Sequence, residues 1–126
     1  MELNRNDKRR QEILGIKLLS DEYDVHRTEF TFEELKQLKE ENFLDLESRQ
    51  NYAPSTGDFM EWLENNPKFM AHGYIVTPDR DDYRVSIEGV ESSEELTKSE
   101  ARCFVDFCRM ADEFDFEDFN YRAWWD

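Results

Sequence analysis

Cysteine is scarce in this 126-residue chain, which contains only Cys103 and Cys108. Both fall in a stretch, residues 98–112, whose apolar spacing predicts a helix. Five helical steps of 100° place them about 140° apart around the axis, with Cα atoms on the order of 8–9 Å apart. A disulfide spans less than about 7 Å between Cα atoms, so a disulfide and shared metal ligation are both disfavoured. We therefore expect a disulfide-free cytoplasmic protein, with Cys108 in the core and Cys103 near its margin.

Glycine is also sparse, and its spacing excludes the common glycine-dependent sites. The four glycines, Gly15, Gly57, Gly73 and Gly89, lie far apart in the sequence. They cannot form a glycine-rich loop that cradles a phosphate. The Gly-x-Ser-x-Gly motif of serine hydrolases is missing as well. The sequence therefore predicts no cofactor and no catalytic residues, and it favours a protein that is not an enzyme.

Basic residues and long apolar runs are the other deficits. The chain has 16 Lys and Arg against 31 Asp and Glu, which gives a formal net charge of −15 at pH 7. Such a chain repels a phosphate backbone, so we expect no direct binding of nucleic acid. The apolar run at residues 13–19 is interrupted by Lys17 and is shorter than the ~20 residues of a membrane span. Neither a membrane partner nor a secretory segment is predicted.

Aromatic residues are abundant, with 10 Phe, 5 Tyr and 3 Trp. Each ring buries on the order of 150–250 Å². We therefore expect an aromatic-rich core that folds residues 1–126 as one domain, although high charge with low hydrophobicity would otherwise suggest disorder. For residues 1–12 two interpretations stay open. Their basic cluster either contacts the acidic surface or belongs to a mobile end.

The clearest strand pattern lies in residues 72–90. Two runs rich in Tyr, Ile and Val flank a polar turn at 78–82, which is typical of a β-hairpin. Apolar and polar residues alternate over 83–90, so one face of the hairpin should be buried. Residues 25–30, after a turn at 20–24, would supply a third strand. Since an isolated hairpin is marginally stable, we predict a small α+β domain in which a central antiparallel hairpin of two to three strands is packed by three to four helices.

Four helices are predicted, and capping boxes mark the start of two of them. Thr31 and Thr97 each precede a Glu at the third helical position, so helices should begin directly after them. These helices should end near residues 42 and 112. A helix over 7–14 capped by Asn6 and a short helix over 58–65 are predicted as well.

The C-terminal stretch 114–126 alternates acids with aromatic rings. In one interpretation these rings close the core under the sheet. In the other they anchor a protein partner, because Trp and Tyr contribute disproportionately to interface energy. Two arginines in the hairpin form either surface ion pairs or a contact to a carboxylate or phosphate. The candidate partner-binding residues are Phe119, Tyr121, Trp124, Trp125, Arg80, Asp81, Asp82 and Arg84.

Together these features predict a non-enzymatic, acidic, cytoplasmic module that binds an unidentified protein, for which a basic protein is one candidate. One alternative is mimicry of nucleic-acid charge toward a basic DNA- or RNA-binding protein. Another is a metal-binding, ligand-binding or enzymatic site formed by His72 with Asp79, Asp81 and Asp82. Clustered carboxylates suit hard cations, but Asp is also favoured in turns for its bonds to the local backbone. We expect no bound metal.

Overall fold

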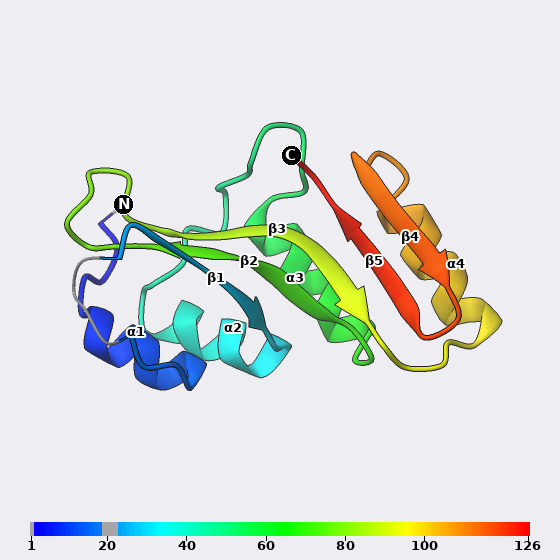
Figure 1. The fold of residues 1–126 in the computed structure, drawn as a ribbon, viewed down its shortest axis with the longest axis horizontal. Coiled ribbons are helices and arrows are strands. Elements are labelled where there is room, and N and C mark those ends of the chain that lie inside the picture. The colour runs from blue at the N-terminus through cyan, green and yellow to red at the C-terminus, as the bar shows by residue number, and fades with distance from the viewer. Residues whose placement is uncertain (1, 19–22) are drawn as a thin grey trace.

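The fold is a twisted antiparallel sheet with helices packed against it (Figure 1). The computed structural model describes residues 2–18 and 23–126, and within them the sheet has five strands in the order β1-β2-β3-β5-β4. The α+β class and the four helices are confirmed, whereas the prediction of two to three strands is wrong. The elements are α1 (Asp7–Leu14), β1 (Val25–Phe30), α2 (Phe32–Glu40), α3 (Thr56–Asn65), β2 (Met70–Val76), β3 (Val85–Ser92), α4 (Lys98–Phe107), β4 (Glu113–Glu117) and β5 (Asn120–Trp124).

The predicted central hairpin is present as β2 and β3, and the predicted third strand is present as β1. Residues 19–22, which hold most of the turn expected before β1, lie outside the described residues. The register between β2 and β3 shifts at His72 and Gly73. At Gly73 the carbonyl oxygen of Ser86 would lie only 1.9 Å from an added Cβ atom, so the close approach of the two strands requires glycine there.

The helix starts follow from local hydrogen bonds. Thr31 and Thr97 both form the predicted capping boxes, and Asn6 accepts from the backbone amide of Arg9. A third capping box, formed by Ser55 and Asp58, starts α3 at Thr56, slightly earlier than predicted. The helix α4 ends at Phe107 and not near residue 112, which leaves room for a strand that begins at residue 113.

The basic cluster near the N-terminus contacts the rest of the chain. The Arg10 side chain is fully buried, pairs with Asp7 at 2.8 Å and donates to the carbonyl of Val76 at 2.7 Å. Its guanidinium lies 4.4 Å from the centre of the Tyr83 ring. Arg9 donates two hydrogen bonds, each 2.7 Å, to the carboxylate of Glu41. These contacts favour the first of the two interpretations, in which the basic cluster contacts acidic residues of the chain.

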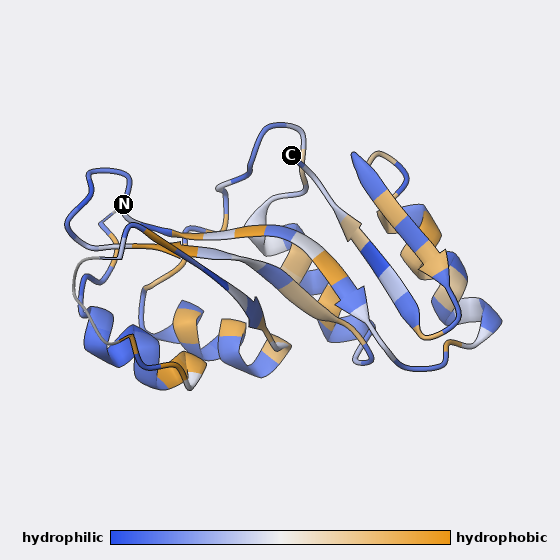
Figure 2. Ribbon diagram, in the orientation of Figure 1, coloured by the Kyte–Doolittle hydropathy of each residue, from blue (hydrophilic) through white to orange (hydrophobic). Residues whose placement is uncertain are grey.

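The strands β4 and β5 form a second hairpin that the sequence analysis did not predict. Its two-residue turn is Asp118-Phe119, and Phe119 adopts the left-handed conformation at φ 63°. This region has a period of two, because Phe114 and Phe116 alternate with acids, as Figure 2 shows along β4. Acidic residues are depleted in strands, and no Asn-Gly or Asp-Gly pair marks the turn, which is why the hairpin was missed.

The core is rich in aromatic residues, as expected. Phe30, Phe43, Phe59 and Phe104 are at most 1 % exposed and lie together with aliphatic residues of the sheet and helices. Long apolar helices play no part in this fold: among the described helices, none has the length and hydropathy needed to cross a membrane.

Candidate functional site

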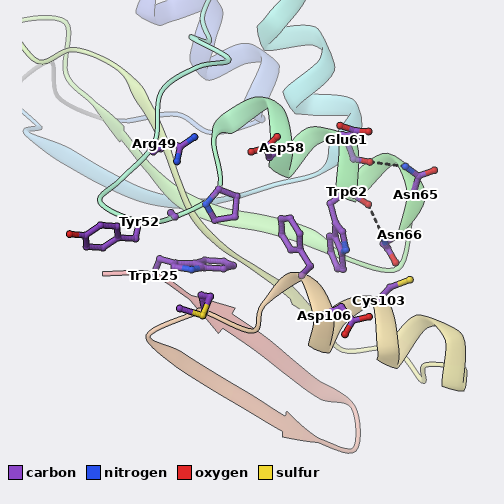
Figure 3. A pocket seen from close by; sticks show the side chains of 14 residues that line it. Arg49, Tyr52, Asp58, Glu61, Trp62, Asn65, Asn66, Cys103, Asp106 and Trp125 are labelled. Carbon is purple, nitrogen blue, oxygen red and sulfur yellow. Dashed lines mark hydrogen bonds between the residues drawn. The ribbon is translucent and has the colours of Figure 1, made fainter.

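A cleft of about 820 Å³ is lined by α3 and α4 and reaches the loop at residues 49–54 (Figure 3). The two helices meet through a stack of rings, in which Trp62 of α3 and Phe107 of α4 lie 4.7 Å apart and nearly parallel at 12°. Trp125, just beyond β5, adds a third ring that meets Phe107 edge-on at 6.1 Å. The volume falls in the range of ligand-binding clefts, ~300–1,000 Å³.

Trp62, Phe107 and Trp125 form the floor of the cleft, and contacts with Phe59 and with β3 hold these rings in place. Phe59, one turn before Trp62 on α3, contacts both Phe107 and Trp125 edge-on at 5.6 and 5.5 Å. The backbone amide of Trp125 donates to the carbonyl of Glu88 on β3 at 2.9 Å. Trp125 itself is only 2 % exposed. The floor is therefore a fixed set of rings, whose accessible surfaces belong mainly to Trp62 and Phe107.

The rim of the cleft is acidic. Asp58 and Glu61 come from α3 and Asp106 comes from α4, against a single basic residue, Arg49, from the loop. Asp106 pairs with Arg109 at 3.2 Å, but both side chains are largely exposed, so that pair is weak. Figure 3 shows Glu61 and Asp106 on either side of Trp62, whereas Arg49 lies toward Asp58. Carboxylates therefore lie on both sides of the partly exposed Trp62 ring.

Two apolar side chains and a thiol stand at the edge of the cleft. Tyr52 is 95 % exposed and Met110 is 79 % exposed. Cys103, expected near the margin of the core, is an exposed free thiol at the end of the cleft beside Asp106, whereas Cys108 is a buried free thiol, as predicted. Burial raises the pKa of Cys108 to about 12. Cys103 is therefore the thiol that a reagent reaches, and it lies where a bound molecule would cover it.

This arrangement suits a cation that carries an apolar stem. An ammonium or guanidinium over the face of Trp62 that Phe107 does not cover, flanked by carboxylates, is attracted both to the ring and to the acids. Metal chemistry has no comparable support, because residues 2–18 and 23–126 contain no group of three or more His, Cys, Asp or Glu side chains that could hold a metal ion.

The structure separates the predicted aromatic candidates of the C-terminal stretch. Tyr121 lies in the core and Trp125 in the floor of the cleft, both buried. Trp124 lies on the opposite face of β5, with the guanidinium of Arg122 4.7 Å from its ring centre. Phe119 stands at the hairpin turn and is 58 % exposed. Tyr121 and Trp125 are thus buried inside the domain, whereas Phe119 remains exposed to solvent.

The predicted candidates in the turn between β2 and β3 form an ion-pair cluster. Arg80 donates two hydrogen bonds, each 2.8 Å, to the carboxylate of Asp82, and Arg84 donates a third at 3.0 Å. The Arg80 guanidinium is the main cause that lowers the pKa of Asp82. Arg84 also donates to the Tyr74 hydroxyl at 2.8 Å. Both arginines are thus engaged within the chain, while Asp81 remains exposed.

His72 and the acids of that turn do not come together. His72 pairs with Glu29 and Gly89 near the start of β2, and it lies four residue steps, or ~13 Å, before Val76, where the strand ends and the turn begins. Its side chain is buried, and its Nδ1 atom has no hydrogen-bond partner among the described residues. Burial first, then the charges of Arg122 and Arg27, lower its pKa to about 4. The combined site that the sequence suggested is therefore not formed.

The cleft itself was not predicted from the sequence, and neither were Trp62, Phe107, Glu61 and Asp106 as residues of a site. Trp62 and Phe107 each fit the apolar arc of a predicted helix, a pattern typical of packed residues, so neither stands out in the sequence as a site residue. The available signal was the breadth of the apolar arc on residues 98–112, where Phe107 and Met110 extend beyond the residues needed for one packed face.

No known protein family, curated protein or solved structure matches this chain.

Proposed function

We propose that this protein binds a basic protein and that the cleft between α3 and α4 holds one lysine or arginine side chain of that partner. The observation that supports this proposal is the ring of Trp62 between the carboxylates of Glu61 and Asp106. A cation is the ligand that gains from both kinds of contact, since a cation–π contact contributes ~0.5–2 kcal/mol.

The surroundings of the cleft favour a protein over a free small molecule. The cleft is shallow and open to solvent, so it would cover only part of a small ligand. The exposed Tyr52 and Met110 extend its apolar surface outward, and Tyr is enriched in protein interfaces while Met adapts to varied partners. The net charge of −15 would attract a basic partner over long range and speed its association.

Two short peptides that differ in one charge test the proposal. The first carries a single Arg between Gly and Ser residues, and the second carries citrulline, a neutral isostere, at the same position. The side-chain indole N–H signals of Trp62 and Trp125 in an NMR spectrum report on the cleft. We expect saturable shifts with the Arg peptide and roughly tenfold weaker shifts with citrulline, because loss of the charge removes both attractions.

Cys103 supplies a second readout of the same site. A bound Arg peptide should slow alkylation of Cys103, while Cys108 stays unmodified in both states because it is buried. The double variant Glu61→Gln with Asp106→Asn should weaken binding about fivefold to tenfold. A double variant with the same charge change elsewhere, Glu40→Gln with Glu47→Gln, should bind almost as the unmodified chain. Equal shifts with both peptides, or equal weakening in both variants, would contradict the proposal.

A further inference from the structure

The strand β4 is an outer edge of the sheet. It pairs only with β5, so among the described residues its other side faces no strand. Every residue of β4 is exposed. The unpaired N–H and C=O groups of such an edge form a template on which another strand can pair. Figure 1 shows β4 at one end of the molecule, with α4 behind it and the free side pointing away from the sheet.

The two faces of β4 differ in chemistry. Phe114 and Phe116 point toward α4, where their rings stack on Phe104 at 5.0 and 6.1 Å. Even so, they are 41 % and 47 % exposed, because no neighbouring strand covers their outer sides. The alternate residues Glu113, Asp115 and Glu117 point to the other face. The free edge therefore offers a row of half-covered rings on one face and a row of carboxylates on the other.

A second copy of this chain does not fit the edge. Antiparallel pairing of two β4 strands about their centre would place Asp115 opposite its own copy and Glu113 opposite Glu117. Like charges directly opposite each other in a sheet are destabilising. A shift by one residue would instead move the rings of one strand to the acidic face of the other. The acidic residues of β4 thus disfavour dimerisation through this edge.

We infer that β4 binds an extended segment of a partner protein in which basic and apolar residues alternate. The backbone of that segment would extend the sheet, its apolar side chains would cover Phe114 and Phe116, and its Lys or Arg side chains would lie opposite Glu113, Asp115 and Glu117. This surface is separate from the cleft and specifies a different feature of a partner, namely the order of its residues along a strand.

A set of labelled peptides tests this inference by fluorescence anisotropy. The probe is a capped heptapeptide in which Lys and Val alternate. One control has the same composition with its Lys and Val residues in separate blocks, and another has its backbone amides methylated. We expect saturable binding of the alternating peptide and roughly tenfold weaker binding of both controls, because the first lacks the pattern and the second cannot donate to the edge.

Two charge-matched variants locate the contact. The triple variant Glu113→Gln, Asp115→Asn and Glu117→Gln should bind the alternating peptide roughly tenfold more weakly, as three cross-strand charge pairs are lost. The triple variant Glu40→Gln, Glu47→Gln and Glu64→Gln removes the same charge from exposed helix and loop positions and should bind within about twofold of the unmodified chain. If the first variant fails to fold by circular dichroism, Asp115→Asn alone replaces it.

The inference is overturned if the block peptide or the methylated peptide binds as well as the alternating one. It is also overturned if both triple variants weaken binding equally, since general attraction to an acidic protein would then explain the result. A stable dimer of the free protein that is lost on substitution of β4 would equally overturn it. Protection of the β4 amides from hydrogen exchange by the alternating peptide would support it.

Discussion

The buried imidazole of His72 should make this protein lose stability in mild acid. The residue is 8 % exposed, and burial together with the nearby Arg122 and Arg27 lowers its pKa to about 4. The Glu91 carboxylate is 3.7 Å from Nδ1, too far for a hydrogen bond that would offset this. In the unfolded chain the same imidazole has its ordinary pKa of ~6.5.

The sign of the effect follows from proton binding. Between pH 6.5 and 4 the unfolded chain binds a proton at His72 and the folded chain does not, so acid favours unfolding. The pKa difference corresponds to roughly 3.4 kcal/mol in full, of which about 2.5 kcal/mol is lost by pH 4.5. The stability attributable to the neutral imidazole is thus present above pH 6.5 and declines as the pH falls toward 4.

Urea unfolding followed by tryptophan fluorescence measures this loss. Carboxylates titrate in the same range, so the comparison is with His72→Gln, which keeps a polar side chain of similar size without the titration. We expect the free energy of unfolding of the unmodified chain to fall by about 2.5 kcal/mol more than that of the variant between pH 7.5 and 4.5. A difference below about 0.5 kcal/mol would refute the reasoning, because His72 would then titrate alike in both states.

Three further perturbations have expected outcomes. Phe119→Gly should raise the free energy of unfolding by roughly 0.5–1 kcal/mol in urea, because glycine adopts the left-handed conformation without the strain of a side chain; a lower value would contradict this. Arg10→Ala should lower it by ~3–5 kcal/mol, since Asp7 loses its buried partner; a loss below ~1 kcal/mol would argue against that role. Iodoacetamide should modify Cys103 in the folded protein and Cys108 only after unfolding, as mass spectrometry would detect; equal modification rates would be inconsistent with the burial of Cys108.

Local interactions explain which parts of the fold were predictable. Thr31 and Thr97 fix helix starts through side chains three residues apart, so the sequence alone locates α2 and α4. The alternation in β3 likewise locates a strand from local sequence, but the expectation of a single buried face is wrong, because Ser86 and Glu88 on the polar face are buried as well. The hairpin of β4 and β5 differs, because its acids oppose strand formation locally and its stability comes from Phe114 and Phe116 stacking on Phe104.

The cleft was beyond prediction for a related reason. It exists because Trp62, Phe107 and Trp125 converge from two helices and the end of a strand, and nothing in their separate sequence neighbourhoods specifies that contact. The acids on its rim were visible only as part of the net charge. Of the predicted candidates, Trp125 alone belongs to this cleft, where it is almost completely buried.

The order of the strands gives the C-terminal hairpin a single attachment to the sheet. Among residues 2–18 and 23–126, β4 joins it only through β5, which pairs with β3 from Gly89–Trp124 to Ser92–Tyr121. An opening that separates β5 from β3 would therefore release both strands together and withdraw Trp125 from the cleft. The edge strand and the cleft floor thus share one local unfolding equilibrium, so a molecule bound in the cleft would also suppress the opening of the edge.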